Sequence, residues 1–312
     1  MKKKLIVVAG PTASGKTALA VMLAKSLGGE IISADSMQVY KNMPIATAAP
    51  TAEEQAKAPH HLVEFLNPDE SFSVAQWCSL ARKKIDEIEA RGNIPIIAGG
   101  TGLFIDSLVD NIIFEDIAVD EELRAELMQK DTEELYSELM VADPQAAGNI
   151  HKNNKKRVVR ALELYYSGSS KTLQDINSKK TETPFDTLYF FINYRDRQVL
   201  YEKINKRVDR MMSLGLLDEA EANIKKASGT SAQAIGHKEL APFFCGDTPL
   251  EMCIDNLKKE TRHYAKRQIT WFKRRENAVL LEPDVLGDGL NEYALSICED
   301  FINGSFKKAK SE

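Results

Sequence analysis

Cysteine is scarce in this sequence, with four residues among 312, and no two of them form a C-x-x-C pair. Cys78, Cys245, Cys253 and Cys298 stand apart from one another. This spacing argues against a disulfide framework and against a cysteine zinc site. We expect buried or incidental thiols, so the chemistry of the protein must come from other residues.

Long apolar runs are also missing. The lysines at positions 2–4 precede only five apolar residues, too few for a signal-peptide core, and no stretch approaches membrane-spanning length. We expect a cytoplasmic protein without a membrane partner. The net charge of −5 does not by itself indicate an anionic macromolecular partner. A hydrophobic content of 43% allows one large or two modest domains.

A phosphate-loop pattern, G-x-x-x-x-G-K-[ST], is complete near the N-terminus. Its residues are Gly10, Pro11, Thr12, Ala13, Ser14, Gly15, Lys16 and Thr17. An apolar, β-branched run precedes it and a helix-forming segment follows it, which predicts strand, loop and helix in that order. Backbone N–H groups of such a loop bind a diphosphate, Lys16 adds a cation, and the Thr17 hydroxyl can bind magnesium. The loop therefore predicts that a polyphosphate binds here, usually ATP or GTP. It does not indicate which reaction the polyphosphate undergoes.

Two more strands are expected to end beside this loop. Residues 30–34 have the pattern of a second short strand that closes on Asp35 and Ser36, and residues 94–98 precede a second glycine turn that contains Thr101. Because ligand sites lie at the carboxyl ends of parallel strands, Asp35 and Thr101 are expected near the phosphates. Asp35 is a candidate acid or base there. The alternative is that Asp35 and Ser36 only cap a turn.

Two nucleotide-site features are absent. The strand at 94–98 ends in Ala98-Gly99, without the magnesium-binding aspartate that motor ATPases usually carry at a strand end. Residues 205–209 resemble the guanine-reading N-K-x-D motif, but the segment is one residue too long and lies in a predicted helix. Both features argue against a plain ATPase or GTPase.

Strand patterns disappear between residues 116 and 184, where polar helical segments prevail. We therefore expect an α/β fold, a P-loop NTPase-like parallel sheet flanked by helices, with an inserted all-helical domain. Residues 1–115 and 185–312 would form the core, and 116–184 the inserted domain.

Two segments concentrate positive charge. Residues 151–160 contain five Lys or Arg and no acid, and residues 258–275 contain eight Lys or Arg, one Glu and interleaved aromatic residues. Such segments can be solvated faces, and Trp271 and Phe272 can equally be core residues. Two basic segments in an acidic protein nevertheless favour an RNA or DNA partner, because cations neutralise phosphates and aromatic rings stack on bases.

Taken together, six motifs resemble those of the tRNA dimethylallyltransferases, from residue 5 to about residue 282. They are the phosphate loop at 10–17, S-A-D-S at 33–36, G-G-T-G-L at 99–103, R-V-V-R-A-L-E at 157–163, A-I-G at 234–236 and K-R-Q-I-T-W at 266–271. The resemblance implies a bacterial-type enzyme with Mg²⁺ as its cofactor. Nothing in the sequence demands a dimer, so we expect a monomer. It would transfer a dimethylallyl group from dimethylallyl diphosphate to N6 of the adenosine immediately 3′ of the tRNA anticodon, giving N6-dimethylallyladenosine.

The resemblance also implies roles for individual residues. Asp35 would accept the N6 proton, while Lys16, Thr101 and Arg207 would act at the departing diphosphate and Thr17 would bind the metal. The residues implied in binding the tRNA anticodon stem-loop are Asp35, Ser36, Met37, Gln38, Thr101, Arg124, Lys156, Arg157, Arg160, Ala234, Ile235, Gly236, His237, Lys266, Arg267 and Gln268.

Three segments depart from the family pattern. Residues 45–50 read I-A-T-A-A-P where I-G-T-A-K-P is usual, so that Ala49 replaces a lysine. Residues 151–157 read H-K-N-N-K-K-R against H-P-N-D-x-x-R, and His237 stands where a tyrosine is usual. All three lie on the side expected to meet tRNA, whereas the diphosphate and catalytic positions are intact.

Two other functions fit parts of the sequence. A small-molecule or nucleotide kinase would hold ATP in the loop and use Asp35 to activate an acceptor hydroxyl. A non-catalytic RNA-binding protein would carry the loop as a remnant. The basic, aromatic segments argue against the kinase, because such an enzyme needs no such surface.

Overall fold

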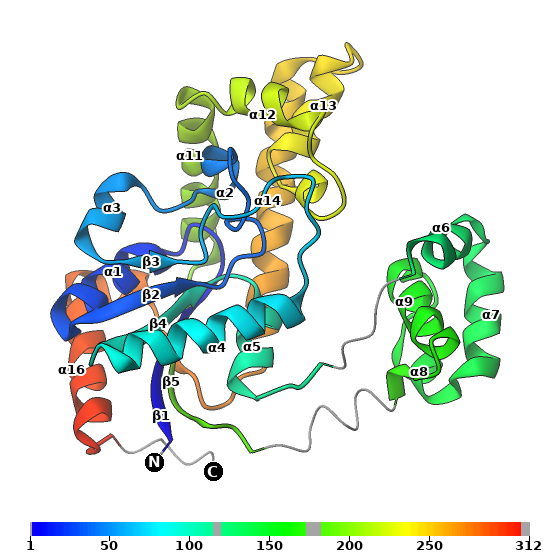
Figure 1. Cartoon of the computed structure of the whole chain (residues 1–312). Coiled ribbons are helices and arrows are strands. Elements are labelled where there is room, and N and C mark those ends of the chain that lie inside the picture. The colour runs from blue at the N-terminus through cyan, green and yellow to red at the C-terminus, as the bar shows by residue number, and fades with distance from the viewer. Residues whose placement is uncertain (1, 115–119, 173–181, 307–312) are drawn as a thin grey trace. The chain divides into compact units, whose positions relative to one another are not determined.

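The computed structural model describes residues 2–114, 120–172 and 182–306. The chain forms two compact units, one from Met1–Val109 and Pro184–Glu312 and the other from Asp110–Thr183 (Figure 1). The smaller unit corresponds to the insertion expected at 116–184 and begins at Asp110.

The larger unit is built on six parallel strands in the order β3-β2-β4-β1-β5-β6. The strands are β1 (Lys3–Ala9), β2 (Gly29–Ser33), β3 (His60–His61), β4 (Ile94–Gly99), β5 (Phe185–Ile192) and β6 (Val279–Leu281). Its helices are α1 (Lys16–Leu27), α2 (Pro44–Thr47), α3 (Ala52–Lys57), α4 (Val74–Ala90), α5 (Gly102–Val109), α11 (Arg197–Ser213), α12 (Leu216–Ile224), α13 (His237–Phe244), α14 (Leu250–Phe272), α15 (Pro283–Leu286) and α16 (Leu290–Asn303), with short 3₁₀ turns at Ser231–Gln233 and Gly287–Gly289. The predicted α/β fold with a parallel sheet is confirmed.

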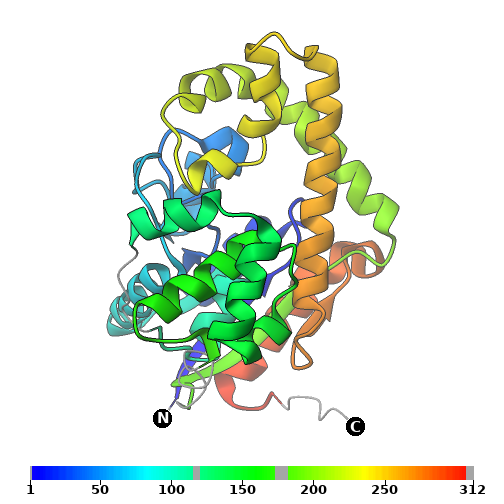
Figure 2. The same cartoon turned by 90° about the vertical axis from the view of Figure 1, so that its right-hand side faces the viewer.

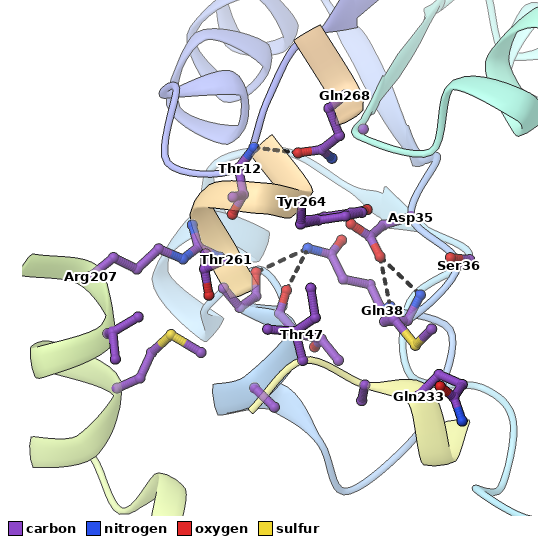
Figure 3. A pocket seen from close by; sticks show the side chains of 18 of the residues that line it. Thr12, Asp35, Ser36, Gln38, Thr47, Arg207, Gln233, Thr261, Tyr264 and Gln268 are labelled. Carbon is purple, nitrogen blue, oxygen red and sulfur yellow. Dashed lines mark hydrogen bonds between the residues drawn. The ribbon is translucent and has the colours of Figure 1, made fainter. Parts of the chain in front are cut away.

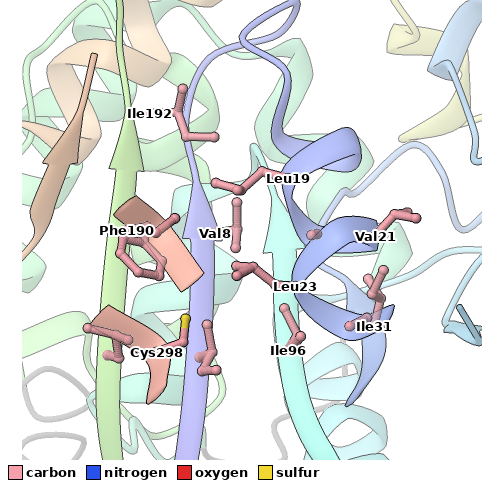
Figure 4. Packing of buried hydrophobic residues seen from close by; sticks show 14 of the residues in the cluster. Val8, Leu19, Val21, Leu23, Ile31, Ile96, Phe190, Ile192 and Cys298 are labelled. Atoms are coloured by element: carbon pink, nitrogen blue, oxygen red, sulfur yellow. The ribbon is translucent and has the colours of Figure 1, made fainter. Parts of the chain in front are cut away.

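Helices cover both faces of this sheet. Ile6 and Val8 of β1 pack with α1 and α16, whereas Leu5 and Val7 point to the opposite face, and all four side chains are fully buried. Figure 4 shows Val8 and Phe190 in the cluster with α1 and α16. Because neither face meets water, the strands read as unbroken apolar runs rather than alternating ones.

The register of the central strands determines where the loops leave the sheet. Ala9 pairs with Gly99, and Ser33 pairs with Ala98. The carboxyl ends of β1, β4 and β2 therefore lie at one edge, where the phosphate loop, the second glycine turn and Asp35 follow them. Figures 1 and 2 show α12, α13 and the N-terminal half of α14 beyond this edge.

The other end of the sheet carries an ionic cluster around Glu30, a buried residue near the start of β2. Its carboxylate accepts hydrogen bonds from Arg91 Nε and Nη2 at 2.9 and 2.8 Å, from Asn93 Nδ2 at 2.8 Å, and contacts His61 Nε2 at 2.6 Å. The Arg91 guanidinium, opposed by burial, lowers the pKa of Glu30 to about 2.

We predict that Glu30→Gln destabilises the fold at neutral pH, by about 3 kcal/mol, because a buried ion pair loses one partner. The depressed pKa of Glu30 contributes stability above pH 4.5 that is lost as the pH falls from 4.5 towards 2. Urea unfolding at pH 7 and pH 3 measures this effect: the difference between the two proteins should shrink at pH 3. An equal difference at both values contradicts the prediction.

The smaller unit, in its described residues, is made of helices. They are α6 (Glu121–Gln129), α7 (Thr132–Ala142), α8 (Pro144–Asn149) and α9 (Lys155–Tyr166). Asp120, Asp131 and Asp143 accept hydrogen bonds from backbone N–H groups at the starts of α6, α7 and α8. Leu135 and Leu162 are among the buried residues of its separate core. Across the described parts of both units, no helix combines the length and the apolar character needed to cross a membrane.

Candidate active site

A cavity of about 340 Å³ lies at the carboxyl edge of the sheet (Figure 3). It is formed by the phosphate loop, the turn after β2, α2, α11, the segment before α13, and α14. The predicted site residues that line it are Thr12, Lys16, Thr17, Asp35, Ser36, Met37, Gln38, Arg207, Ala234, Ile235, Arg267 and Gln268. Segments more than 200 residues apart in sequence, such as Thr12 and Gln268, thus meet in one place.

The phosphate loop packs tightly against the sheet. A Cβ on Gly10 would lie 2.6 Å from the carbonyl oxygen of Ile192 in β5, so only glycine fits there. Ser14 N donates to Pro11 O at 3.3 Å. The Ser14 hydroxyl is buried and has no hydrogen-bond partner among the described residues. A buried polar atom of this kind is available to a bound anion.

Two cations share one end of the cavity. Lys16 Nζ donates to Pro11 O at 2.6 Å, and burial together with the positive charge of Arg207 lowers the pKa of Lys16 to about 7. Burial also lowers the pKa of Arg207, and the negative charge of Asp35 opposes this shift. An anion bound at this end would relieve the repulsion between the two cations, which suits a diphosphate.

Asp35 both caps a turn and lines the cavity, so its capping role does not exclude a role as an acid or base. Its Oδ1 accepts hydrogen bonds from Met37 N at 2.9 Å and Gln38 N at 3.4 Å. Thr101 supports the same turn from outside the cavity lining, because its Oγ1 accepts from Ser36 N at 3.0 Å. Thr101 thus contacts the residue after Asp35.

Gln268 links the two glycine turns. Its Oε1 accepts from Thr12 N at 2.8 Å, and its Nε2 donates to Gly100 O at 2.9 Å. A Cβ on Gly100 would lie 2.1 Å from Gln268 Nε2, so the link requires glycine at that position. Gln268 is buried. The structure therefore gives it a role within the protein, besides the tRNA contact implied by the resemblance.

We predict that Gln268→Ala raises the KM for a diphosphate substrate by about tenfold, because the phosphate loop loses a fixed contact. The turnover number should change less, since the reacting groups remain in place. Steady-state kinetics measures both values. Thr270→Ala, an exposed change on the same helix, is the control. Equal KM values in the two variants would contradict this role.

Tyr264 is a site residue that the sequence motifs do not identify. It lines the cavity, and its hydroxyl is hydrogen-bonded to Thr101 and Gln268. Burial and, to a lesser extent, the negative charge of Asp35 raise the pKa of this hydroxyl. A helical pattern could have found it: residues 257, 261, 264 and 268 all line the cavity and recur at helical spacing. Thr47, Gln233, Lys238 and Thr261 also line the cavity without having been predicted.

His237 does not line the cavity. Its side chain is buried, and Nε2 lies 3.1 Å from Oε1 of Glu219. Gly236 precedes it as the N-terminal cap of α13. Of the predicted segment before α13, only Ala234 and Ile235 reach the cavity. The replacement of the usual tyrosine by His237 therefore changes the protein interior and not the cavity lining.

Several basic side chains of residues 258–275 contact other residues of the protein, so not all of them are available to a partner. Arg267 lines the cavity and stacks over Tyr264 at 5.7 Å, Arg274 stacks over Trp271, and Lys258 pairs with Asp209. Phe272 is buried, as the core interpretation of this residue expects. Lys266 is exposed.

In the smaller unit, the predicted basic residues divide into two kinds. Arg124 Nε donates to Oε1 of Glu163 at 2.5 Å, and Arg160 Nη1 donates to Oε2 of the same buried carboxylate at 3.0 Å. Lys156 and Arg157 are exposed. Glu163 thus orients Arg124 and Arg160, whereas Lys156 and Arg157 present their charge to solvent.

The described residues contain no group of three or more His, Cys, Asp or Glu side chains that could hold a metal ion. Thr17 is nevertheless on the cavity wall beside Lys16. Magnesium is commonly held by one or two protein groups together with phosphate oxygens and waters. The residues present therefore fit a metal that arrives with a diphosphate.

Comparison with known proteins agrees with these features. The family model described as IPP transferase matches residues 38–275. A tRNA dimethylallyltransferase of Acetivibrio thermocellus is 45% identical over 288 residues, which cover 90% of this chain and 92% of the relative.

Two solved structures extend the comparison to the fold. The tRNA isopentenylpyrophosphate transferase of Bacillus halodurans aligns with a TM-score of 0.71 and 42% identity over 97% of each chain. A eukaryotic dimethylallyltransferase acting on tRNA aligns with a TM-score of 0.85 and 30% identity, over 99% of this chain and 82% of that one. The resemblance drawn from the motifs is confirmed, and the kinase and non-catalytic alternatives find no support. The chain therefore belongs to the IPP transferase family.

Proposed function

We propose that this protein transfers a dimethylallyl group from dimethylallyl diphosphate to N6 of the adenosine immediately 3′ of the anticodon in tRNA. The observation that carries the proposal is a single cavity in which a phosphate loop, a carboxylate and an apolar wall meet. A prenyl diphosphate needs the phosphate loop and the apolar wall, and an attacking amine needs the carboxylate. The family and the names of its members support the same reaction.

The cationic end of the cavity binds the diphosphate. Lys16, the loop N–H groups and Arg207 stabilise the negative charge that grows on the diphosphate as it leaves. Magnesium, held by the Thr17 hydroxyl and the substrate, would supply further charge neutralisation there. This reaction moves a prenyl group and transfers no phosphoryl group, so the magnesium-binding acid that motor ATPases carry at the equivalent strand end is not required. We therefore assign the loop to a prenyl diphosphate rather than to ATP.

Asp35 receives the proton of the acceptor. The N6 nitrogen attacks C1 of the dimethylallyl group, the bond from C1 to the diphosphate oxygen breaks, and one N6 proton passes to the carboxylate. The turn amides of Met37 and Gln38 both bind Oδ1, so Oδ2 is the oxygen that we assign to the proton. An exocyclic amine of adenine is barely basic, so a positioned acceptor assists the attack.

The tRNA must deliver an unstacked base, because N6 cannot react inside the stacked loop. Ser36 and Met37 line the cavity beside Asp35 and would contact the flipped base. The exposed charges of Lys156, Arg157 and Lys266 would neutralise phosphates of the anticodon stem-loop. We infer a monomer that acts in the cytoplasm, where tRNA is found.

The test combines radiolabelled dimethylallyl diphosphate, magnesium and unmodified tRNA, with ATP consumption measured in parallel. We expect label to enter tRNA without loss of ATP. Nucleoside mass spectrometry of the product should show N6-dimethylallyladenosine. ATP consumption without labelled tRNA would refute the proposal in favour of a kinase.

A further inference from the structure

The side chain of Gln38 makes its hydrogen bonds inside the protein, although the resemblance implies a tRNA contact for this residue. Its Nε2 donates to Thr47 O at 3.3 Å and to Ala48 O at 3.0 Å, at the C-terminal end of α2 (Figure 3). Its Oε1 accepts from Ser33 Oγ at 2.8 Å, at the end of β2. A side-chain amide has two N–H groups, and two carbonyl oxygens of the protein bind them here. The amide therefore links β2 to α2.

Glu219 on α12 binds the opposite end of α2. Its Oε2 accepts from Ile45 N at 2.7 Å, and its Oε1 accepts from Ala46 N at 2.9 Å. The side chain is only 8% exposed, and His237 Nε2 lies 3.1 Å from Oε1. The N–H groups in the first turn of a helix have no acceptor within the helix, so the carboxylate supplies the missing acceptors.

Helix α2 cannot hold its position by burial alone. It has four residues, none of them is fully buried, and a helix this short is not stable by itself. Ala46, Thr47 and Ala48 nevertheless line the cavity. The bonds from Gln38 and Glu219 therefore hold one wall of the candidate active site in place.

Gln38 also binds the candidate base. Its main-chain N–H donates to Asp35 Oδ1 at 3.4 Å, beside the N–H of Met37 at 2.9 Å. The side chain of Gln38 is thus anchored on α2, while its main chain holds the carboxylate of Asp35. A displacement of α2 would release the side chain of Gln38 and loosen this turn.

We propose that Gln38 and Glu219 are positioning residues, which hold α2 at both ends and thereby fix the turn that carries Asp35. The inference deepens the proposed function and rests on it, because it explains how the base is held in place for transfer. A displacement of a reacting group by about 1 Å can slow an enzyme about a hundredfold. The network thus matters for the rate of transfer rather than for the affinity of either substrate.

The first test changes the Gln38 side chain. Gln38→Met keeps its length and removes its polar bonds, so the single-turnover rate of prenyl transfer should fall by about a hundredfold. The dissociation constants of tRNA and of pyrophosphate should stay at their wild-type values. Gln55→Met, the same change at an exposed position outside the cavity lining, should transfer at the wild-type rate. A loss of tRNA affinity that accounts for the lost activity would make Gln38 a tRNA contact and overturn the inference.

A double-mutant cycle shows whether the effect passes through Asp35. Asp35→Asn cannot accept the proton, so the exact placement of this side chain should no longer control the rate. Gln38→Met should therefore slow the Asp35→Asn enzyme by about threefold or less. Equal slowing in both backgrounds would mean that Gln38 acts independently of the base, and the inference would be wrong.

Amide hydrogen exchange, followed by NMR, tests the link without activity. Glu219→Gln leaves one oxygen to accept from two N–H groups, so the first amides of α2 should exchange faster. If α2 fixes the turn, the amides of Met37 and Gln38 should also exchange about tenfold faster. Glu221→Gln removes the same charge from an exposed position on the same helix and should change neither group. Faster exchange in α2 alone would show that α2 does not hold the turn that carries Asp35.

The outcomes distinguish the inference from the proposed function. If the wild type does not transfer label to tRNA, the proposed function fails, and the exchange rates still decide whether α2 fixes the turn. If the wild type transfers label and Gln38→Met does so at the same rate, only the inference fails. Should thermal melting show that Glu219→Gln does not fold, Gln38→Met allows the same comparison from the other end of α2, with about tenfold faster exchange expected at the Met37 amide.

Discussion

Replacing Asp35 by asparagine should reduce the turnover number for prenyl transfer to tRNA by about a thousandfold, within the range of positioned general bases. Asparagine is close in size and keeps an oxygen for the amides of Met37 and Gln38, so the turn should survive. What it loses is the ability to take the N6 proton. Single-turnover assays with labelled dimethylallyl diphosphate measure the loss.

Two controls show that the loss is chemical. Binding of tRNA to Asp35→Asn should match the wild type, and pyrophosphate should still bind the phosphate loop. Thr270→Ala, an exposed change on α14 outside the cavity lining, should retain the wild-type activity. Undiminished transfer by Asp35→Asn would remove Asp35 from the role of base.

The strand ends were predictable because they depend on local rules. An apolar run followed by a glycine loop, and another that ends at Asp35, are visible in the sequence, and parallel strands bring their carboxyl ends together. The pairing of Ala9 with Gly99 and of Ser33 with Ala98 aligns the carboxyl ends of β1, β4 and β2 at one edge of the sheet.

The contacts that complete the cavity were not predictable in the same way. Glu219 binds backbone amides about 170 residues earlier in the chain, and a backbone amide leaves no signature in a sequence. The resemblance implies only a tRNA contact for Gln268, although its hydrogen bonds go to Thr12 and Gly100 inside the protein. Charge counts cannot distinguish a side chain that faces a partner from one that holds two loops together. Helical spacing along α14 would have grouped Tyr264 with Gln268.

Lys16→Met should abolish diphosphate binding and at the same time stabilise the protein. Lys16 is half-buried, and desolvation together with the positive charge of Arg207 lowers its pKa from 10.5 to about 7. The unfolded chain therefore binds more protons than the folded one between pH 7 and pH 10.5, so wild-type stability should rise with pH across that window. Methionine removes this partly desolvated charge, and the melting temperature at pH 7 should rise by about 3 °C or more.

The same pKa predicts how diphosphate affinity depends on pH. A bound diphosphate raises the pKa of Lys16, so binding above pH 7 requires the uptake of a proton. The wild-type affinity for pyrophosphate should fall as the pH rises from 7 to 9, approaching tenfold per unit, and calorimetry in buffers of different ionisation enthalpy should detect the proton uptake. Lys16→Arg keeps its charge throughout this range and should show a much flatter profile. A wild-type profile as flat as that of Lys16→Arg would mean that Lys16 is already fully charged in the free enzyme, and that the anion site does not depend on relieving a partly desolvated cation.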